Sequence, residues 1–170
     1  MSFSPQQLLS TLSCIASALS HLHSLGAAPT PLITAPTPVS HTFAGISHGD
    51  LYGHNIMHRG DGAALLGDFG AATIYGSSGT VSDHAASSGG RGSDARVCVH
   101  TRLQHIEVRA FGIFMLELLA RATHVDEVVE STKRIACCCA SESFDERPLF
   151  AAIDEQLQML IGRRSEEHGA

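Results

Sequence analysis

Two short segments of this 170-residue chain carry the side chains with the clearest chemical potential. Residues 48–55 read HGDLYGHN, and they place Asp50 ahead of Asn55 in one loop-like stretch. Residues 68–70 read DFG and supply a second carboxylate. Transfer of a phosphoryl group needs a carboxylate beside the attacking hydroxyl and oxygen ligands for a magnesium ion that bridges phosphates. Asp50, Asn55 and Asp68 together provide that set.

Each of these residues also has an ordinary structural interpretation. Asp50 could cap a turn, Asn55 could satisfy backbone groups of a loop, and Asp68 could begin a turn at the end of a strand. His48 and Phe69 are expected in the hydrophobic core under either interpretation. The order and spacing of the two segments favour the chemical interpretation.

The elements that must position these segments are mainly helical. Apolar residues at spacings of three and four predict an amphipathic helix over residues 5–25, with Ser4 as its N-cap. A strongly apolar helix is expected over 103–120, and two more near 125–140 and 147–161. The predicted fold class is therefore mainly α, as a helical bundle with a small β part.

The β part is expected to be a hairpin, because short apolar strands lie on either side of a turn at 58–62. Residues 27–44 are rich in Pro and Thr and predict an inserted loop. Residues 76–97 are rich in Ser, Gly and Asp and predict a flexible surface loop. One domain is expected over 1–161, followed by a C-terminal tail over 162–170.

Composition excludes several classes of function. The net charge is −6 and the only lysine is Lys133, whereas nucleic-acid phosphates are bound through many cations, so no nucleic-acid partner is expected. No apolar run reaches the ~18 residues of a membrane span, and the first residues lack a signal-peptide pattern, which predicts a cytoplasmic protein. The cysteines form no CxxC pair, and the run at 137–139 predicts buried free thiols.

The two chemical segments and their flanks resemble the C-terminal lobe of protein kinases. Residues 18–26 (ALSHLHSLG) are similar to the end of the helix that precedes the kinase catalytic loop. Residues 107–112 (EVRAFG) are similar to the start of the long central helix, and residues 144–150 (FDERPLF) to the opening of the last helix. The resemblance covers most of residues 3–161, outside the two predicted loops.

The resemblance implies a role for each matching residue of the site. Asp50 would be the catalytic base that orients the hydroxyl of a protein substrate. Asn55 and Asp68 would hold Mg²⁺, and Met57 would lie beneath the adenine of ATP. The cofactors implied are therefore ATP and Mg²⁺, with Asp68 contacting the nucleotide through the metal.

The resemblance also implies structural support from residues around the site, namely His48, Phe69, Gly70, Glu107 and Arg147. His48 and Phe69 would belong to a stacked apolar column that aligns the site. Glu107 would hydrogen-bond the backbone around His48. The carboxylate partner that Arg147 has in most kinases is not recognisable in this sequence.

The sequence departs from the kinase pattern as well. No glycine-rich loop and no phosphate-pairing strand lysine occur, so the ATP-gripping N-terminal lobe is expected to be missing and activity to be weak. Gly49 stands where kinases carry arginine, and control by loop phosphorylation is not expected. Tyr52 stands where serine/threonine kinases carry lysine, which leaves the acceptor open.

Two alternative functions therefore stay open. One is a non-catalytic pseudokinase fragment that binds a partner protein, for example through the surface that would face an N-terminal lobe. The other is a small-molecule phosphotransferase of the aminoglycoside or choline kinase type, which shares the HGD form of the loop.

Overall fold

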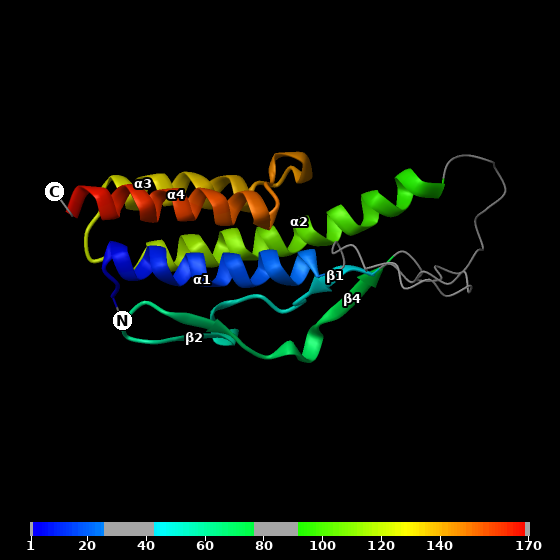
Figure 1. The fold of residues 1–170 in the computed structure, drawn as a ribbon, viewed down its shortest axis with the longest axis horizontal. Coiled ribbons are helices and arrows are strands. Elements are labelled where there is room, and N and C mark those ends of the chain that lie inside the picture. The colour runs from blue at the N-terminus through cyan, green and yellow to red at the C-terminus, as the bar shows by residue number, and fades with distance from the viewer. Residues whose placement is uncertain (1, 26–42, 77–91, 169–170) are drawn as a thin grey trace, which may run out of the picture.

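The computed structural model describes residues 2–25, 43–76 and 92–168, and this part is mainly helical (Figure 1). In chain order its elements are α1 (Pro5–Ser24), β1 (Phe43–Ser47), η1 (Gly53–Asn55), β2 (Ile56–His58), β3 (Ala64–Leu66), η2 (Phe69–Ala71), β4 (Thr73–Gly76), α2 (Gly92–Leu119), α3 (Glu127–Ala140), η3 (Phe144–Glu146) and α4 (Phe150–His168). The predicted α-rich class is confirmed.

Helix α1 begins where the sequence predicts, because Ser4 and Gln7 cap it reciprocally. The Ser4 hydroxyl accepts a hydrogen bond from the Gln7 amide at 3.2 Å, and the Gln7 side-chain oxygen accepts one from the Ser4 amide at 2.9 Å. The apolar stripe of α1 is buried, including Leu8, Leu12, Ile15 and Leu19. This stripe supplies one side of the hydrophobic core.

The four α-helices of the described residues pack as two pairs, α1 with α4 and α2 with α3. Gly112 allows α2 and α3 to approach closely, because a Cβ at this position would lie 2.5 Å from the Ala140 amide nitrogen. Phe111 and Phe150 are fully buried between the pairs, with their ring centroids 5.5 Å apart. The core is therefore helical, and the strands lie along one side of it (Figure 1).

The strands form two antiparallel pairs. β2 pairs with β3 as the predicted hairpin, with Met57 opposite Leu65. β1 pairs with β4, with Ile46 opposite Ile74, and this second pair was not predicted. Together the two pairs hold residues 48–55 and 67–72 between strands that lie along α1 (Figure 1).

The predicted boundaries of both loops are wrong where the structure describes them. Gly76 ends β4 and residues 92–97 already belong to α2, so the loop predicted over 76–97 is wrong at both ends. Residues 95–100 contain neither Gly nor Pro, so nothing there stops a helix. Likewise the last two residues of the loop predicted over 27–44 belong to β1. The central parts of both predictions lie outside the described residues.

The predicted tail is also wrong, because α4 continues to His168. Gly162 costs a helix only about 1 kcal/mol relative to alanine, which one interaction can offset. The Arg164 guanidinium contacts the Asp126 carboxylate at 3.0 Å and so ties the extra turns of α4 to the start of α3. Residue 161 is therefore no structural boundary.

Helix α4 begins at Phe150, later than predicted. Arg147 has an extended backbone (φ −78°, ψ 124°), as expected for a residue that precedes proline.

The cysteine run is only partly buried. Cys139 is fully buried, and burial raises the pKa of its thiol to about 12, but Cys137 and Cys138 are exposed. Successive residues of a helix point in different directions, so a run of three cannot share one buried face.

Candidate active site

The first chemical segment is anchored by His48, whose side chain is fully buried. Its Nε2 donates a hydrogen bond at 2.8 Å to the carbonyl of Gly67, the residue that directly precedes the second segment. Its ring also meets the ring of Phe69 edge-on, with centroids 4.8 Å apart. One imidazole therefore ties residues 48–55 to residues 67–70.

Glu107 on α2 is the centre of a buried polar network beneath this segment. One carboxylate oxygen accepts hydrogen bonds from the Gly49 amide at 2.8 Å and from the Ser47 hydroxyl at 3.2 Å. The other oxygen lies 2.5 Å from Nε2 of His23. The expected bond from Glu107 to the backbone beside His48 is thus present, and the loop is fixed to two helices.

Sequence reasoning missed His23 and Ser47 as partners of Glu107. A signal for His23 was present, because it follows Leu19 by one helical turn and so lies on the buried stripe of α1. His23 is 7% exposed, whereas the neighbouring His21 is exposed. No comparable pattern marks Ser47.

Gly49 could not be replaced by a larger residue in this geometry. Its φ of +80° is a backbone conformation that favours glycine, and a Cβ would lie 2.4 Å from the carbonyl oxygen of Ala71. The position where kinases carry arginine is therefore one where the two loop segments touch directly.

Asp50 and Asn55 are held together by the amide of Asn55. Its Nδ2 donates to the Asp50 carbonyl at 2.8 Å and to the Asp50 carboxylate at 3.0 Å. Both residues are half-buried. Because the nitrogen is engaged by Asp50, the amide oxygen Oδ1 is the atom that Asn55 can offer to a metal ion.

A backbone hydrogen bond joins the start of the second segment to the end of the first. The Gly67 amide donates to the Asn55 carbonyl at 2.8 Å, which sets Asp68 at the next position along the chain. Asp68 has φ 56° and ψ 77°, and within the described ranges it is the only residue other than glycine with a positive φ. Its carboxylate accepts a bond from the Gly70 amide at 3.2 Å. Such a conformation costs about 1–3 kcal/mol and is common in functional sites.

The prediction that Phe69 is a core residue is wrong, since its side chain is 48% exposed. Its ring packs against the ring of His48. Asp68 and Gly70 are exposed as well. The second segment is therefore attached to the first on one side only.

An exposed apolar surface adjoins these two segments. Met57 and Leu65 face each other in the β2–β3 register and are 57% and 60% exposed. Met57 thus lies on an open face, where a flat apolar ligand or another apolar surface could cover it.

A hollow of about 320 Å³ lies on the other side of the first segment, between β4 and α2. It is lined by Gly49, Ala71, Tyr75 and Glu107, among others. Burial raises the pKa of the Tyr75 phenol above its ordinary value. A hydrogen bond from Gln104 opposes this shift, and the Glu107 charge adds to it. The lining of this hollow thus includes a phenol that is protonated at neutral pH.

Arg147 is buried at 5% exposure and has a purely structural environment. Its guanidinium donates to three backbone carbonyls, those of Ser141 at 2.7 Å, Glu142 at 3.0 Å and His105 at 3.1 Å. It also lies 4.4 Å from the ring centroid of Phe144. Backbone carbonyls thus provide the partners that the sequence did not reveal.

The structure thus brings Asp50, Asn55 and Asp68 to adjoining positions. Magnesium is commonly bound through one or two carboxylates together with water and phosphate oxygens, which is the kind of set that Asp68 and Asn55 can offer. A cluster of three His, Cys, Asp or Glu side chains arranged for a metal ion does not occur in the described part of the chain.

Comparison with known proteins adds no relative. No protein-family model matches the chain, and a search of curated proteins gave no match. In the described ranges no helix is both long and apolar enough to cross a membrane. A functional interpretation therefore depends on the residues and geometry given above.

Proposed function

We propose that this chain forms the magnesium-holding lobe of a protein-kinase-type phosphotransferase, with ATP and Mg²⁺ as cofactors. The observation that carries the proposal is the backbone bond from Gly67 to Asn55. This bond puts Asp68 beside Asn55, and the side chain of Asn55 in turn holds Asp50. The bond supports the proposal because the three residues that would act as base and metal ligands come from segments that are separate in sequence.

The residues of the first segment would orient the acceptor. The carboxylate of Asp50 would accept a hydrogen bond from the attacking hydroxyl, and the Asn55 amide fixes the direction of that carboxylate. Glu107 accepts a hydrogen bond from the Gly49 amide and so fixes the loop, which means that the loop would need little reorganisation during the reaction. Bound MgATP would supply the phosphoryl group.

The residues of the second segment would hold the cation. Asp68 has a left-handed backbone conformation at the start of η2. The Gly70 amide donates a hydrogen bond to one oxygen of its carboxylate and so orients that oxygen. The other oxygen of Asp68 and Oδ1 of Asn55 are the ligands that we propose for magnesium. Met57, on the exposed face beside them, is the proposed floor for adenine.

Within this sequence nothing supplies the phosphate-pairing lysine, because the only lysine, Lys133, lies on α3 far from these segments in sequence. That function would have to come from residues outside these 170 or from a partner protein. We therefore expect weak nucleotide binding and slow transfer from the 170-residue chain, since phosphoryl transfer depends mainly on positioning and electrostatics.

The test is magnesium-dependent binding of a fluorescent ATP analogue to the purified chain. Asp68→Asn should weaken the binding by about tenfold, as expected for loss of a charged ligand. Asp61→Asn is a matched control, because Asp61 is also exposed and also accepts a bond from the backbone two residues on. Equal affinity of the wild type and Asp68→Asn would show that Asp68 is not a metal ligand.

A non-catalytic, partner-binding role is the second candidate, and the exposed apolar side chains of Met57, Leu65 and Phe69 favour it. Apolar patches of this kind mark sites of association. Rapid phosphorylation of serine or tyrosine peptides by the 170-residue chain would reject this alternative.

A small-molecule acceptor is the third candidate, because the glycine of the HGD form is required here by contact with Ala71. A panel of amino-alcohols and aminoglycosides, assayed beside serine and tyrosine peptides, separates this candidate from the first.

A further inference from the structure

A groove lies between α3 and α4, on the side of the bundle that faces away from the strands (Figure 1). α3 packs mainly on α2, and α4 mainly on α1, so few side chains fill the space between α3 and α4. The groove consists of two adjoining hollows of about 220 and 260 Å³, which share Ser131, Leu160 and Arg163. The phosphotransfer proposal does not use this groove.

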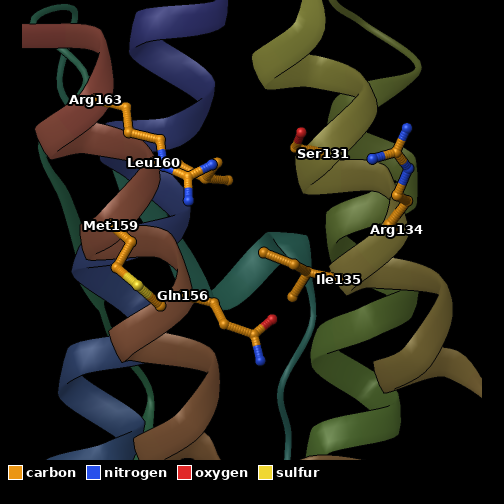
Figure 2. Close-up of a pocket in the computed structure, with 7 residues that line it drawn as sticks. All are labelled: Ser131, Arg134, Ile135, Gln156, Met159, Leu160 and Arg163. Carbon is orange, nitrogen blue, oxygen red and sulfur yellow. The ribbon is translucent and has the colours of Figure 1, made fainter.

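The first hollow has an apolar floor. Figure 2 shows Met159 and Leu160 on α4 on the side that faces Ile135 on α3. Met159 is 49% exposed, although it is a large apolar side chain. Ser131 and Gln156 also line this hollow. An apolar side chain of a partner could be buried on Met159 and Leu160 at little cost, because these two side chains carry no polar group that needs a hydrogen bond.

The rim of this hollow is cationic. Arg134 and Arg163 line it from opposite helices and are both exposed, and no carboxylate lines it. Neither arginine forms an ion pair with any described residue, whereas Arg164 is paired with Asp126. The chain as a whole has a net charge of −6. The first hollow is thus opposite in charge to the whole chain, whereas the second hollow is also lined by the carboxylates of Asp126 and Glu127.

We propose that the first hollow of this groove binds an acidic amphipathic helix of a partner protein. One apolar side chain of that helix would lie on Met159 and Leu160, and carboxylates on either side of it would pair with Arg134 and Arg163. Arginine suits this role, because its planar guanidinium binds carboxylates through two parallel hydrogen bonds. The arrangement follows the general mode in which an amphipathic helix lays its apolar face into a groove.

The probe for this proposal is a fluorescein-labelled peptide of roughly 16 residues, long enough to form a helix, with Leu at spacings of three and four and Glu elsewhere. Fluorescence anisotropy should show saturable binding to the 170-residue chain that weakens as salt is raised. The double variant Arg134→Glu/Arg163→Glu should bind at least about tenfold more weakly, because both pairs become repulsive. Circular dichroism checks that the variant keeps its helices.

Lys133→Glu is the matched control, since Lys133 is exposed on the same helix but does not line the groove. Lys133→Glu and Arg134→Glu change the net charge equally, but only Arg134 lines the hollow. The peptide affinity of Lys133→Glu should therefore stay within about twofold of the wild type, and that of Arg134→Glu should not.

Four results would overturn the proposal. They are equal loss in Lys133→Glu and Arg134→Glu, unchanged binding by the double variant, equal binding of a peptide with Lys in place of Glu, and no saturable binding at all. The double variant and phosphatidylserine vesicles complete the test. If vesicles bind in a manner that requires Arg134 and Arg163 while the acidic peptide does not bind, the groove recognises a membrane surface.

Discussion

The two chemical segments differ in how they are held. Residues 47–49 are fixed from below, where Glu107 accepts hydrogen bonds from Ser47 and Gly49 and contacts His23 in a buried environment. Residues 68–70 are exposed. Two contacts hold them, a hydrogen bond from the Gly70 amide to the Asp68 carboxylate and the ring contact of Phe69 with His48. One half of the candidate site is thus anchored to buried side chains, and the other half lies on the surface.

This difference indicates a division of work. A base that must orient an acceptor benefits from a rigid support, because small displacements cost much of the rate. A metal ligand on an exposed segment can accept its ion and phosphate ligands from the open side. Stability measurements can therefore separate the two halves, because residues of the first half should affect folding and those of the second half should not.

Glu107→Ala should give the largest effect. The change leaves a buried imidazole and a half-buried amide without their partner, which costs about 3 kcal/mol or more of unfolding free energy. Urea denaturation measures it. Glu117→Ala is the control on the same helix, because Glu117 is exposed, and it should stay within about 0.5 kcal/mol. Equal effects of the two changes would remove the distinction between the halves.

Gly49→Ala should come next, with a loss of about 1–3 kcal/mol, because of its positive φ and the close carbonyl of Ala71. Gly53 is the control, since a Cβ there meets nothing within 4 Å. Thermal unfolding of both variants, followed by circular dichroism, makes the comparison. A Gly49→Ala protein as stable as Gly53→Ala would mean that the two loop segments do not touch as described.

Phe69→Ala should cost about 1 kcal/mol or less, because about half of the residue is already exposed. Phe150→Ala, which empties a fully buried position, should cost about 3–5 kcal/mol. The two urea midpoints report the difference directly. A Phe69→Ala loss as large as that of Phe150→Ala would place the second segment in the core after all.

Tyr75 gives the smallest and most local effect, through pH. Burial raises the pKa of its phenol in the folded chain, so the stabilisation is complete below the ordinary value of 10.0 and is lost as pH rises through the higher folded value. Because the chain has two tyrosines, Tyr52→Phe isolates Tyr75 in an ultraviolet titration. The midpoint should lie above 10.0, and adding Glu107→Gln should lower it. A midpoint at or below 10.0 would contradict the buried position.

Much of the fold could be predicted from sequence, because it depends on local patterns. The leucines of α1 and its cap at Ser4 carry their own periodicity, and the hairpin follows from apolar strands around a turn. The pairing of β1 with β4 could not be predicted in the same way, since it joins strands separated by a long stretch of chain. The extent of α4 depends on a contact between Arg164 and Asp126 that no local pattern encodes.

The candidate site was predictable in its residues and less so in its environment. The order of Asp50, Asn55 and Asp68 was enough to suggest that they meet. That His23 is buried and able to meet Glu107 could be predicted from its position one helical turn after Leu19. The exposure of Phe69 could not be predicted, because it depends on which elements lie over the ring and not on the DFG pattern itself.

The most direct test of the central claim is an amide NMR spectrum of the ¹⁵N-labelled chain, titrated with Mn²⁺ as a paramagnetic substitute for Mg²⁺. The account predicts selective broadening of amides in residues 50–55 and 67–70, and loss of that broadening in Asp68→Asn but not in Asp61→Asn. Broadening that centres on the acidic start of α3, or that persists unchanged in Asp68→Asn, would contradict the claim that Asn55 and Asp68 hold a metal ion beside Asp50.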